Sequence, residues 1–424
     1  MSASKRHTPA IVAIGVVLLI GAGMLIGQNA DGSAGNCTEG DCSSGQGTFA
    51  WDNDARYTGS FKNGQPDGRG TYTSPGGVIL EGSFQQGRPQ GYAVLRMPDG
   101  SVYAGDFSAG QIQGDGKYTY GNGPVYTGRF QNGRPTGRGT INFGNGVIYA
   151  GNFVAGTPGG AGELNLPGDG VCRGQFQQGR LNGQGACQFP DAFRVEGRFR
   201  NGLANGPITI EYESGARYSG AARDGLPAGS GKLTFPDGLA YEGQFIAGLF
   251  QGQGELRWPN GDIYKGDFYQ GRMQGSGTLR FADGSRYQGG FQNGLFSGQG
   301  EFTYADDTRY MGQFQQGRFS GTGQMRYPDG ARFEGQFADG KRNGPGRLIR
   351  ADGRDFSGEF RADQFLGEDA DSDSAPATDR QQDESGTEPA SETETQSDST
   401  TSSDAVPATN KQDPGDSSGD SDAP

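Results

Sequence analysis

The sequence predicts an all-β protein: an elongated, twisted, single-layer antiparallel β-sheet built from 23-residue β-hairpin repeats. Three observations predict it. A short phrase, usually an aromatic, any residue, Gly, any residue and Phe, recurs fourteen times at a spacing of 23 residues without insertion. Glycine accounts for 81 of 424 residues, and much of it falls at fixed places in that period. Apolar residues make up only 32% of the chain, too few for a large globular core. A fixed period indicates one small unit stacked on copies of itself.

The repeats cover residues 45–366, beginning with a half-repeat that contains Phe49 and Trp51. About 13 repeats follow it, and the phrase starts at Tyr57, Leu80, Tyr103, Tyr126, Tyr149, Cys172, Val195, Tyr218, Tyr241, Tyr264, Tyr287, Tyr310, Phe333 and Phe356.

A single repeat predicts two strands and two turns. Residues 264–268 alternate between apolar and polar side chains, as a strand does, and residues 279–281 alternate again. Residues 270–277 form a Gly-rich connection between them, and 282–284 form a turn. Helix is excluded because glycine interrupts the array too often.

Two glycine positions occur in all fourteen repeats. The first lies between the two aromatic positions, where we expect a neighbouring ring to lie flat over the backbone. The second lies eleven residues after the repeat start, from Gly68 to Gly367, and we expect it to adopt a positive φ angle.

The repeated turns predict two sheet margins of different charge. On one margin the turns are Asn-Gly or Gln-Gly, and the residue after the turn is often basic, as at Arg88, Arg134, Arg180, Arg272, Arg318 and Lys341. The other carries Asp or Asn, as at Asp99, Asn122, Asn145, Asp191, Asp237, Asn260, Asp283, Asp306, Asp329 and Asp352. These are also good turn residues, which is an alternative explanation of the pattern.

The N-terminal region predicts a membrane anchor. Residues 10–27 are apolar and, as a helix, would span roughly 27 Å, about the thickness of a bilayer core. Lys5 and Arg6 precede them, so residues 1–9 are expected in the cytoplasm, and residues 28–44 become a linker to exported repeats. A cleaved signal peptide is the alternative, and it also exports the repeats, to the periplasm or the extracellular space.

The C-terminal segment, residues 367–424, differs in composition. It contains no aromatic residue and has 16 acidic residues against Arg380 and Lys411, a net charge of −14. This composition predicts a disordered acidic tail. It would act as a solubilising brush over the end of the sheet, or capture divalent cations or a basic partner.

Four cysteines fit an oxidising compartment. Cys37 and Cys42 lie in the linker, and Cys172 and Cys187 replace apolar residues within one repeat. The sequence leaves open whether each pair forms a disulfide or remains as free thiols.

The repeat resembles the MORN repeat (membrane occupation and recognition nexus). Residues 241–245, YEGQF, with Gly248 and the GQG of 252–254, carry the resemblance, as do 287–291 with 298–300. The resemblance covers roughly residues 45–366. It implies an interaction module, because such repeats occur in membrane tethers, cytoskeletal scaffolds and accessory modules of enzymes. The family is associated with phosphoinositide binding and self-association, but an exported array would not meet cytoplasmic phosphoinositides.

Departures from the pattern cluster in residues 172–231. Cys172 and Val195 replace the first aromatic, Ala222 replaces Phe, and Ile208 replaces Gly. The segment is either a bend or specialised site, or one that has drifted.

The sequence does not predict an enzyme, a cofactor or a metal site. The only histidine, His7, precedes the apolar segment, so a Ser-His-Asp triad or a His-rich metal site is unavailable to the repeats. Near Gly231 and Lys232 a phosphate-loop pattern is incomplete, and Gly-x-Gly pairs open strands rather than helices. Nucleic-acid binding is disfavoured because the array is nearly neutral and the tail is acidic.

Surface recognition remains. We predict a non-enzymatic, membrane-tethered scaffold that binds a protein partner or a second copy of itself. The alternative is a carbohydrate- or lipid-binding module that links the membrane to envelope polymers. A single-layer sheet should leave its rings partly exposed. The candidate binding face comprises Tyr103, Phe107, Tyr126, Phe130, Tyr241, Phe245, Tyr264, Phe268, Tyr287, Phe291, Tyr310 and Phe314.

Overall fold

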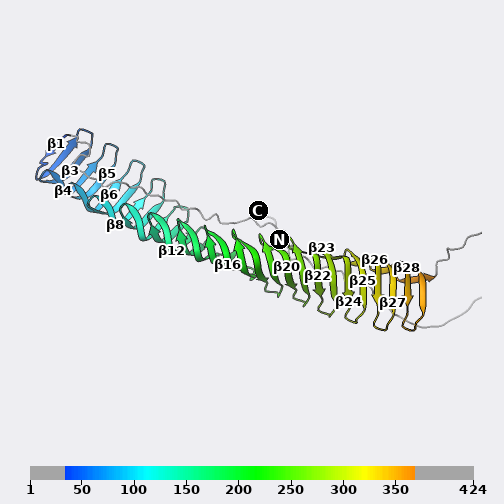
Figure 1. The fold of residues 1–424 in the computed structure, drawn as a ribbon. Coiled ribbons are helices and arrows are strands. Elements are labelled where there is room, and N and C mark those ends of the chain that lie inside the picture. The colour runs from blue at the N-terminus through cyan, green and yellow to red at the C-terminus, as the bar shows by residue number, and fades with distance from the viewer. Residues whose placement is uncertain (1–33, 368–424) are drawn as a thin grey trace, which may run out of the picture. The chain divides into compact units, whose positions relative to one another are not determined.

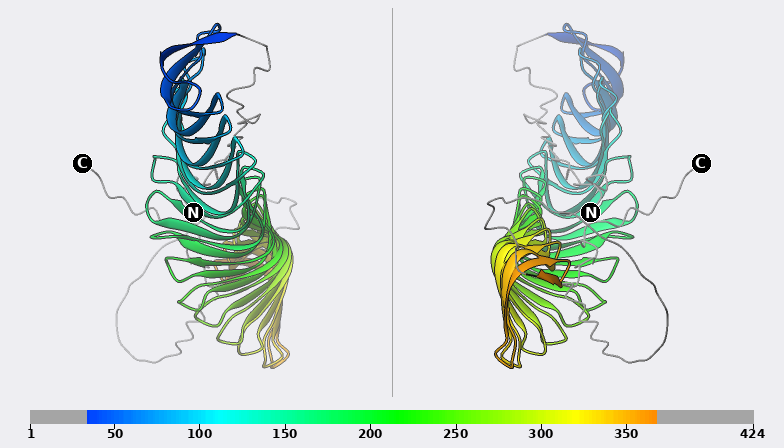
Figure 2. Two further views of the ribbon diagram at one scale, coloured as in Figure 1. Left: turned by 90° about the vertical axis from the view of Figure 1, so that its left-hand side faces the viewer. Right: turned by 90° about the vertical axis from the view of Figure 1, so that its right-hand side faces the viewer.

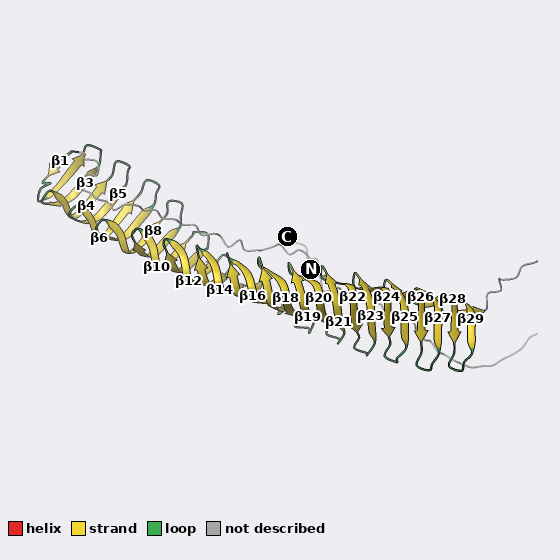
Figure 3. Ribbon diagram, viewed as in Figure 1, coloured by secondary structure: helices red, strands yellow, loops and turns green. Residues whose placement is uncertain are grey.

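The computed structural model describes residues 34–367, and these residues form β-strands and turns with no helix among them (Figure 3). The predicted all-β, antiparallel class is confirmed. Within this range no helix is long and apolar enough to span a membrane. The predicted cytoplasmic N-terminus and signal anchor, and the tail beyond Gly367, lie outside the described residues. The chain divides into two compact units, whose described parts are residues 34–236 and 237–367.

The first unit contains eighteen strands (Figure 1). Every strand pairs antiparallel with the next strand along the chain. The strands are β1 Gly35–Gly40, β2 Gln46–Trp51, β3 Arg56–Lys62, β4 Gln65–Thr73, β5 Ile79–Gln85, β6 Arg88–Arg96, β7 Val102–Ser108, β8 Gln111–Thr119, β9 Val125–Gln131, β10 Arg134–Asn142, β11 Ile148–Val154, β12 Thr157–Leu166, β13 Gly170–Gln177, β14 Arg180–Phe189, β15 Phe193–Arg200, β16 Leu203–Tyr212, β17 Arg217–Arg223 and β18 Leu226–Thr234.

The second unit follows the same rule with twelve strands. They are β19 Ala240–Ile246, β20 Leu249–Arg257, β21 Ile263–Tyr269, β22 Arg272–Arg280, β23 Arg286–Gln292, β24 Leu295–Thr303, β25 Arg309–Gln315, β26 Arg318–Arg326, β27 Arg332–Ala338, β28 Lys341–Ile349, β29 Asp355–Arg361 and β30 Gln364–Gly367.

Three predicted boundaries change. Gly367, which we expected to begin the tail, is the last residue of β30 and pairs with Glu359. Part of the predicted linker, residues 35–40, is β1, which extends the sheet by pairing with β2. The predicted Gly-rich connection at 270–277 shortens to a two-residue turn, Gln270–Gly271, and Gly275 and Gly277 lie within β22. Because Gly277 pairs directly with Gly266, the glycine run continues the ladder rather than interrupting it.

The hairpin turns have the backbone that twisted strands require. Gln270 and Gly271 have φ angles of 50° and 86°, both positive, as in a type I′ turn. The N–H of Gly271 donates to the carbonyl O of Phe250 in the preceding repeat at 2.9 Å. The N–H of Gln270 donates to Oε1 of Gln251 at 3.1 Å. These bonds tie each hairpin end to its neighbour and fix their relative register.

The expected stacking of rings on glycine is confirmed. Gly243 and Gly254 are direct partners on β19 and β20, and a Cβ on Gly254 would lie 2.5 Å from Oη of Tyr241. The tyrosine ring therefore lies across the glycine pair. Its hydroxyl donates to the carbonyl O of Gln244 at 2.9 Å.

The second glycine prediction is also confirmed. All fourteen glycines at that position have positive φ angles, from 60° at Gly321 to 113° at Gly367. A side chain at these positions would be strained in the backbone, whatever the space around it.

The strands are bent, which Figure 2 shows in two views. The register shifts within each repeat hairpin, for example between Gly266 and Phe268. On the inner side of the bend, the ring centroid of Tyr264 lies 5.1 Å from that of Phe268 and 4.8 Å from that of Phe291 in the next repeat. These edge-to-face contacts recur along the second unit and along residues 103–176 of the first, so the bend gives a single-layer sheet a largely aromatic core. Aliphatic side chains such as Val195 and Ile208 fill the core in the remaining part of the first unit.

We predict that three glycine-to-alanine substitutions in the first unit separate steric overlap from backbone strain. Gly70→Ala would overlap the ring of Tyr57, and we expect a loss of about 1–3 kcal/mol in the free energy of unfolding. Gly91→Ala meets no atom within 4 Å but has a φ of 77°, which should cost about 1–2 kcal/mol. Urea denaturation followed by circular dichroism measures both.

Gly76→Ala is the matched control, because its φ is not positive and its new Cβ would lie 3.9 Å from Oγ of Ser74. We expect its effect to stay within about 0.5 kcal/mol. A Gly70→Ala protein as stable as Gly76→Ala would contradict the ring-on-glycine account.

Candidate functional site

The predicted binding face lies in the interior of the bent sheet. Its twelve aromatic side chains are only 0–4% exposed and pack against one another. These residues are Tyr103, Phe107, Tyr126, Phe130, Tyr241, Phe245, Tyr264, Phe268, Tyr287, Phe291, Tyr310 and Phe314. In this conformation they stabilise the fold and present no surface to a ligand. The glycine pair beside each tyrosine is the sequence signal of that role.

Burial also sets the chemistry of the core tyrosines. Burial raises the pKa of Tyr149 to about 12, and it does the same for Tyr241. Both hydroxyls donate to backbone carbonyls, Tyr149 to Asn152 at 3.0 Å and Tyr241 to Gln244 at 2.9 Å. They remain protonated at neutral pH and act as structural donors.

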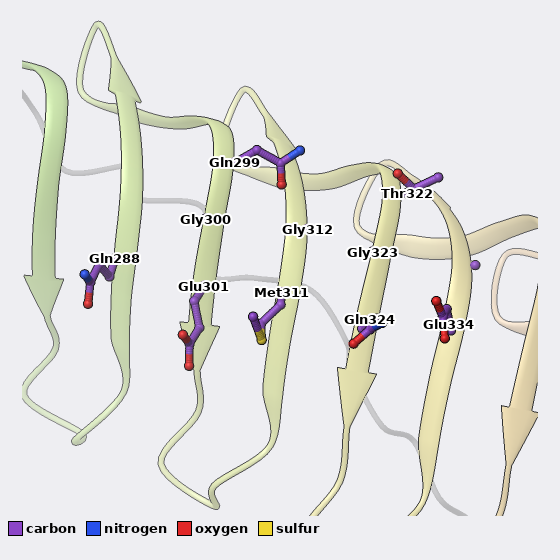
Figure 4. A pocket seen from close by; sticks show the side chains of 11 residues that line it. Gln288, Gln299, Gly300, Glu301, Met311, Gly312, Thr322, Gly323, Gln324 and Glu334 are labelled. Carbon is purple, nitrogen blue, oxygen red and sulfur yellow. The ribbon is translucent and has the colours of Figure 1, made fainter.

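The outward face of the sheet carries the accessible side chains. On β23–β27 they form a row across the strands, over an open hollow of about 730 Å³ whose floor includes paired glycines (Figure 4). We call this row the outward row; it consists of Gln288, Glu301, Met311, Gln324 and Glu334. Amides, carboxylates and one thioether offer hydrogen bonds and a small apolar contact to an extended surface. The residues vary between repeats, so the repeat pattern did not reveal them.

A second hollow, of about 630 Å³, lies over the same repeat positions on β19–β21. Glu255 lies at its centre and binds both Lys265, at 2.7 Å, and Arg257. The two hollows therefore differ in charge, because carboxylates and amides line the first and a salt-bridge cluster lines the second.

The two margins do not separate into one basic and one acidic edge. The turn aspartates stabilise their own turns by hydrogen bonds. Oδ1 of Asp283, for example, accepts a hydrogen bond from the backbone N–H of Ser285 at 2.8 Å. Exposed arginines such as Arg280 and Arg286 lie on the strand ends beside these same turns. The margin that we expected to be acidic therefore carries both signs.

The structure joins both cysteine pairs as disulfides. Cys37 bonds to Cys42 next to the turn between β1 and β2, and Cys172 bonds to Cys187 between directly paired positions of β13 and β14. In that repeat the side chain of Leu181 covers the glycine pair that a tyrosine ring covers elsewhere. Strand pairing continues through residues 172–231, so the departures from the repeat pattern are accommodated without breaking the sheet.

Within residues 34–367, no group of three or more His, Cys, Asp or Glu side chains is arranged to hold a metal ion.

Comparison with known proteins identifies the repeat. The MORN repeat matches eleven segments that together cover more than half of the chain. They are residues 57–78, 81–102, 103–125, 126–148, 172–192, 218–240, 241–263, 264–286, 287–309, 310–332 and 333–353. The chain belongs to the MORN repeat family. Proteins of this family are generally scaffolds for interactions with proteins or membranes.

Among curated proteins no match is found for this MORN-repeat chain. Solved structures with some similarity include the TCP domain of Drosophila melanogaster SAS-4 in complex with a proline-rich motif of Ana2. That domain shares 13% identity over 38% of this chain and 88% of its own length, with a TM-score of 0.25. The TCP10 domain of Danio rerio CPAP with a STIL peptide shares 14% over 67% and 99%, with a TM-score of 0.21. Likenesses this weak do not define the fold or the function of the MORN-repeat chain.

We predict that the array loses stability in alkali because its core tyrosines must stay protonated. An unfolded tyrosine ionises near its ordinary pKa of about 10, whereas burial raises the pKa of Tyr241 to about 12. Between these values the unfolded chain binds fewer protons, so the free energy of unfolding falls as pH rises. Below pH 10 this contribution is fully present.

Urea unfolding midpoints at pH 8, 10 and 11 measure the effect. Tyr241→Phe should unfold more easily at pH 8, by about 1 kcal/mol for the lost hydrogen bond, and should show a shallower alkaline decline. A midpoint that is constant up to pH 11 would show that these hydroxyls are not held in the interior.

Proposed function

We propose that this MORN-repeat chain is a non-enzymatic, membrane-tethered scaffold whose outward face binds a protein partner or a second copy of the chain. The family is one of interaction scaffolds, which sets the general class. The distribution of side chains over the two faces of the sheet favours the outward face as the binding surface.

One observation carries the proposal. The rings of the inner face pack against one another in the core, since tyrosines such as Tyr264 are fully buried and donate a hydrogen bond to the backbone. The outward row on β23–β27 instead presents polar side chains in register above an open hollow. Neighbouring strands lie about 4.8 Å apart, so the row offers regularly spaced contacts to an extended partner surface.

The chemistry of the described residues supports a role without catalysis. Repeated aspartates such as Asp283 and Asp329 accept hydrogen bonds from backbone N–H groups within their own turns. The hollows are open, whereas sites for small molecules generally enclose most of their ligand. Binding of an extended surface suits this geometry better than turnover of a substrate.

The membrane tether and export are part of the same proposal. The apolar run at residues 10–27 follows Lys5 and Arg6, which favours a cytoplasmic N-terminus and exported repeats. Both disulfides support export, because such bonds form and persist mainly in oxidising compartments.

We predict that substitutions in the outward row abolish partner binding and leave the fold intact. The test variant is Gln288→Ala, Glu301→Ala and Gln324→Ala in the full chain. The matched control is Gln184→Ala, Gln188→Ala and Glu196→Ala on the first unit, which removes the same side chains and, like Glu301, a carboxylate paired with an arginine. All six positions are exposed or half-buried.

Affinity capture from envelope proteins and light scattering for self-association are the two readouts. We expect the test variant to lose one of these interactions while the control keeps it. Equal binding by both variants would contradict the outward row as the site. Retention on polysaccharides or lipid vesicles, without protein capture or self-association, would favour the carbohydrate- or lipid-binding alternative.

The topology gives a separate prediction. Protease added outside intact spheroplasts should degrade the repeats, while a cytoplasmic marker protein stays whole. Repeats that survive until the membrane is lysed would place them in the cytoplasm and contradict export.

A further inference from the structure

Five exposed arginines form a row across the second unit, beside the aspartate turns. We call it the arginine row: Arg280, Arg286, Arg309, Arg326 and Arg332, on β22, β23, β25, β26 and β27. Each projects from the outward side of its strand, because its neighbours in sequence that face inward, such as Leu279 and Tyr287, are buried. The row crosses six consecutive strands, a width of about 24 Å.

The register sets like charges opposite one another. Arg280 is the direct partner of Arg286 on the neighbouring strand. Arg326 is the partner of Arg309 on one side and of Arg332 on the other. Like charges directly opposite in a sheet are destabilising, so this arrangement favours an anionic occupant.

Only one arginine of the row is held in an ion pair. Arg309 forms an ion pair with Glu301 at 3.1 Å, but among residues 237–367 no carboxylate forms an ion pair with the other four arginines. Asp355, beyond one end of the row, is bound to Arg347 at 2.6 Å. The turn aspartates, such as Asp283, lie beside the row and accept backbone hydrogen bonds, without forming an ion pair with its arginines.

The chain itself supplies an anion of suitable charge and reach. Residues 368–424 contain 16 acidic residues against Arg380 and Lys411, a net charge of −14. They follow Gly367 at the end of β30, three strands beyond β27 in the pairing order and thus roughly 15 Å across the sheet. Fifty-seven residues can extend to roughly 190 Å, far more than the row requires.

Attachment to the same unit raises the local concentration of the tail. A tethered segment binds as an intramolecular ligand, so individually weak contacts between exposed charges add up. A free polyanion is present only at its bulk concentration, so it competes poorly with the tethered tail.

We propose that the acidic tail, residues 368–424, binds the arginine row and covers that part of the outward face. The contact is electrostatic and needs charge rather than one fixed geometry. This inference goes beyond the proposed scaffold function, because it assigns an internal ligand to a surface next to the outward row. External anions then reach the arginine row only by displacing the tail.

Energy transfer within the full chain tests the proposal. All four native cysteines form disulfides, so cysteines introduced by Thr278→Cys on β22 and Ser399→Cys in the tail can carry a donor and an acceptor dye. We expect high transfer at low ionic strength and a progressive loss as salt shortens the range of the attraction.

Matched variants identify the surface. Arg280→Gln, Arg286→Gln, Arg326→Gln and Arg332→Gln together should lower transfer at low salt to its high-salt value, whereas the same four changes to Lys should keep it. The control replaces Arg69, Arg88, Arg134 and Arg138 by Gln, an equal change of charge at exposed positions of the first unit. Circular dichroism verifies that each variant is folded.

Two results would overturn the proposal. One is transfer that the four glutamine substitutions in the arginine row leave unchanged. The other is a control variant that loses transfer as fully as the arginine-row variant, which would mean that the tail responds to net charge alone. Neither result depends on a partner protein, so this experiment tests the tail contact independently of the proposed scaffold function.

Discussion

The contact between a tyrosine ring and a cross-strand pair of glycines underlies the whole sheet. Tyr241 lies flat over Gly243 and Gly254 because neither glycine carries a Cβ that would collide with the ring. Its hydroxyl donates to the backbone of Gln244, so the buried oxygen is satisfied. Rings placed this way reach the phenylalanines of their own and the next repeat. A local contact within one hairpin thereby becomes the coupling between hairpins.

This coupling decides which surface remains for recognition. A flat single layer would leave both faces exposed to water, but the bend encloses the rings, so the accessible side chains lie on the outward face. We expect the fold to tolerate substitution there, since the side chains of the outward row are exposed or half-buried and lie outside the core. The repeats of this chain therefore keep one architecture while their exposed positions differ from copy to copy, which suits a binding role.

Charge on that face is organised by strand register. Arg309 and Arg326 lie 17 residues apart in the chain and yet are direct neighbours across two strands. A nearly neutral array can thus place several arginines directly beside one another, which its net charge does not reveal. The chain's excess of negative charge lies after Gly367, where residues 368–424 carry a net charge of −14, so the tail has the charge opposite to that of the arginine row.

The sequence by itself determined the hairpin repeat and both glycine roles, because these depend on conformations that only certain residues adopt locally. Gly68 needs its positive φ, and the glycine partners of Tyr57 need their missing Cβ, in any copy of the hairpin. Only the tertiary structure decided that the aromatic face is a core, that residues 35–40 add a strand, and that Cys172 lies against Cys187. Exposure depends on the bend of the strands and on the packing of one repeat against the next. A repeating pattern of residue types contains no direct measure of either.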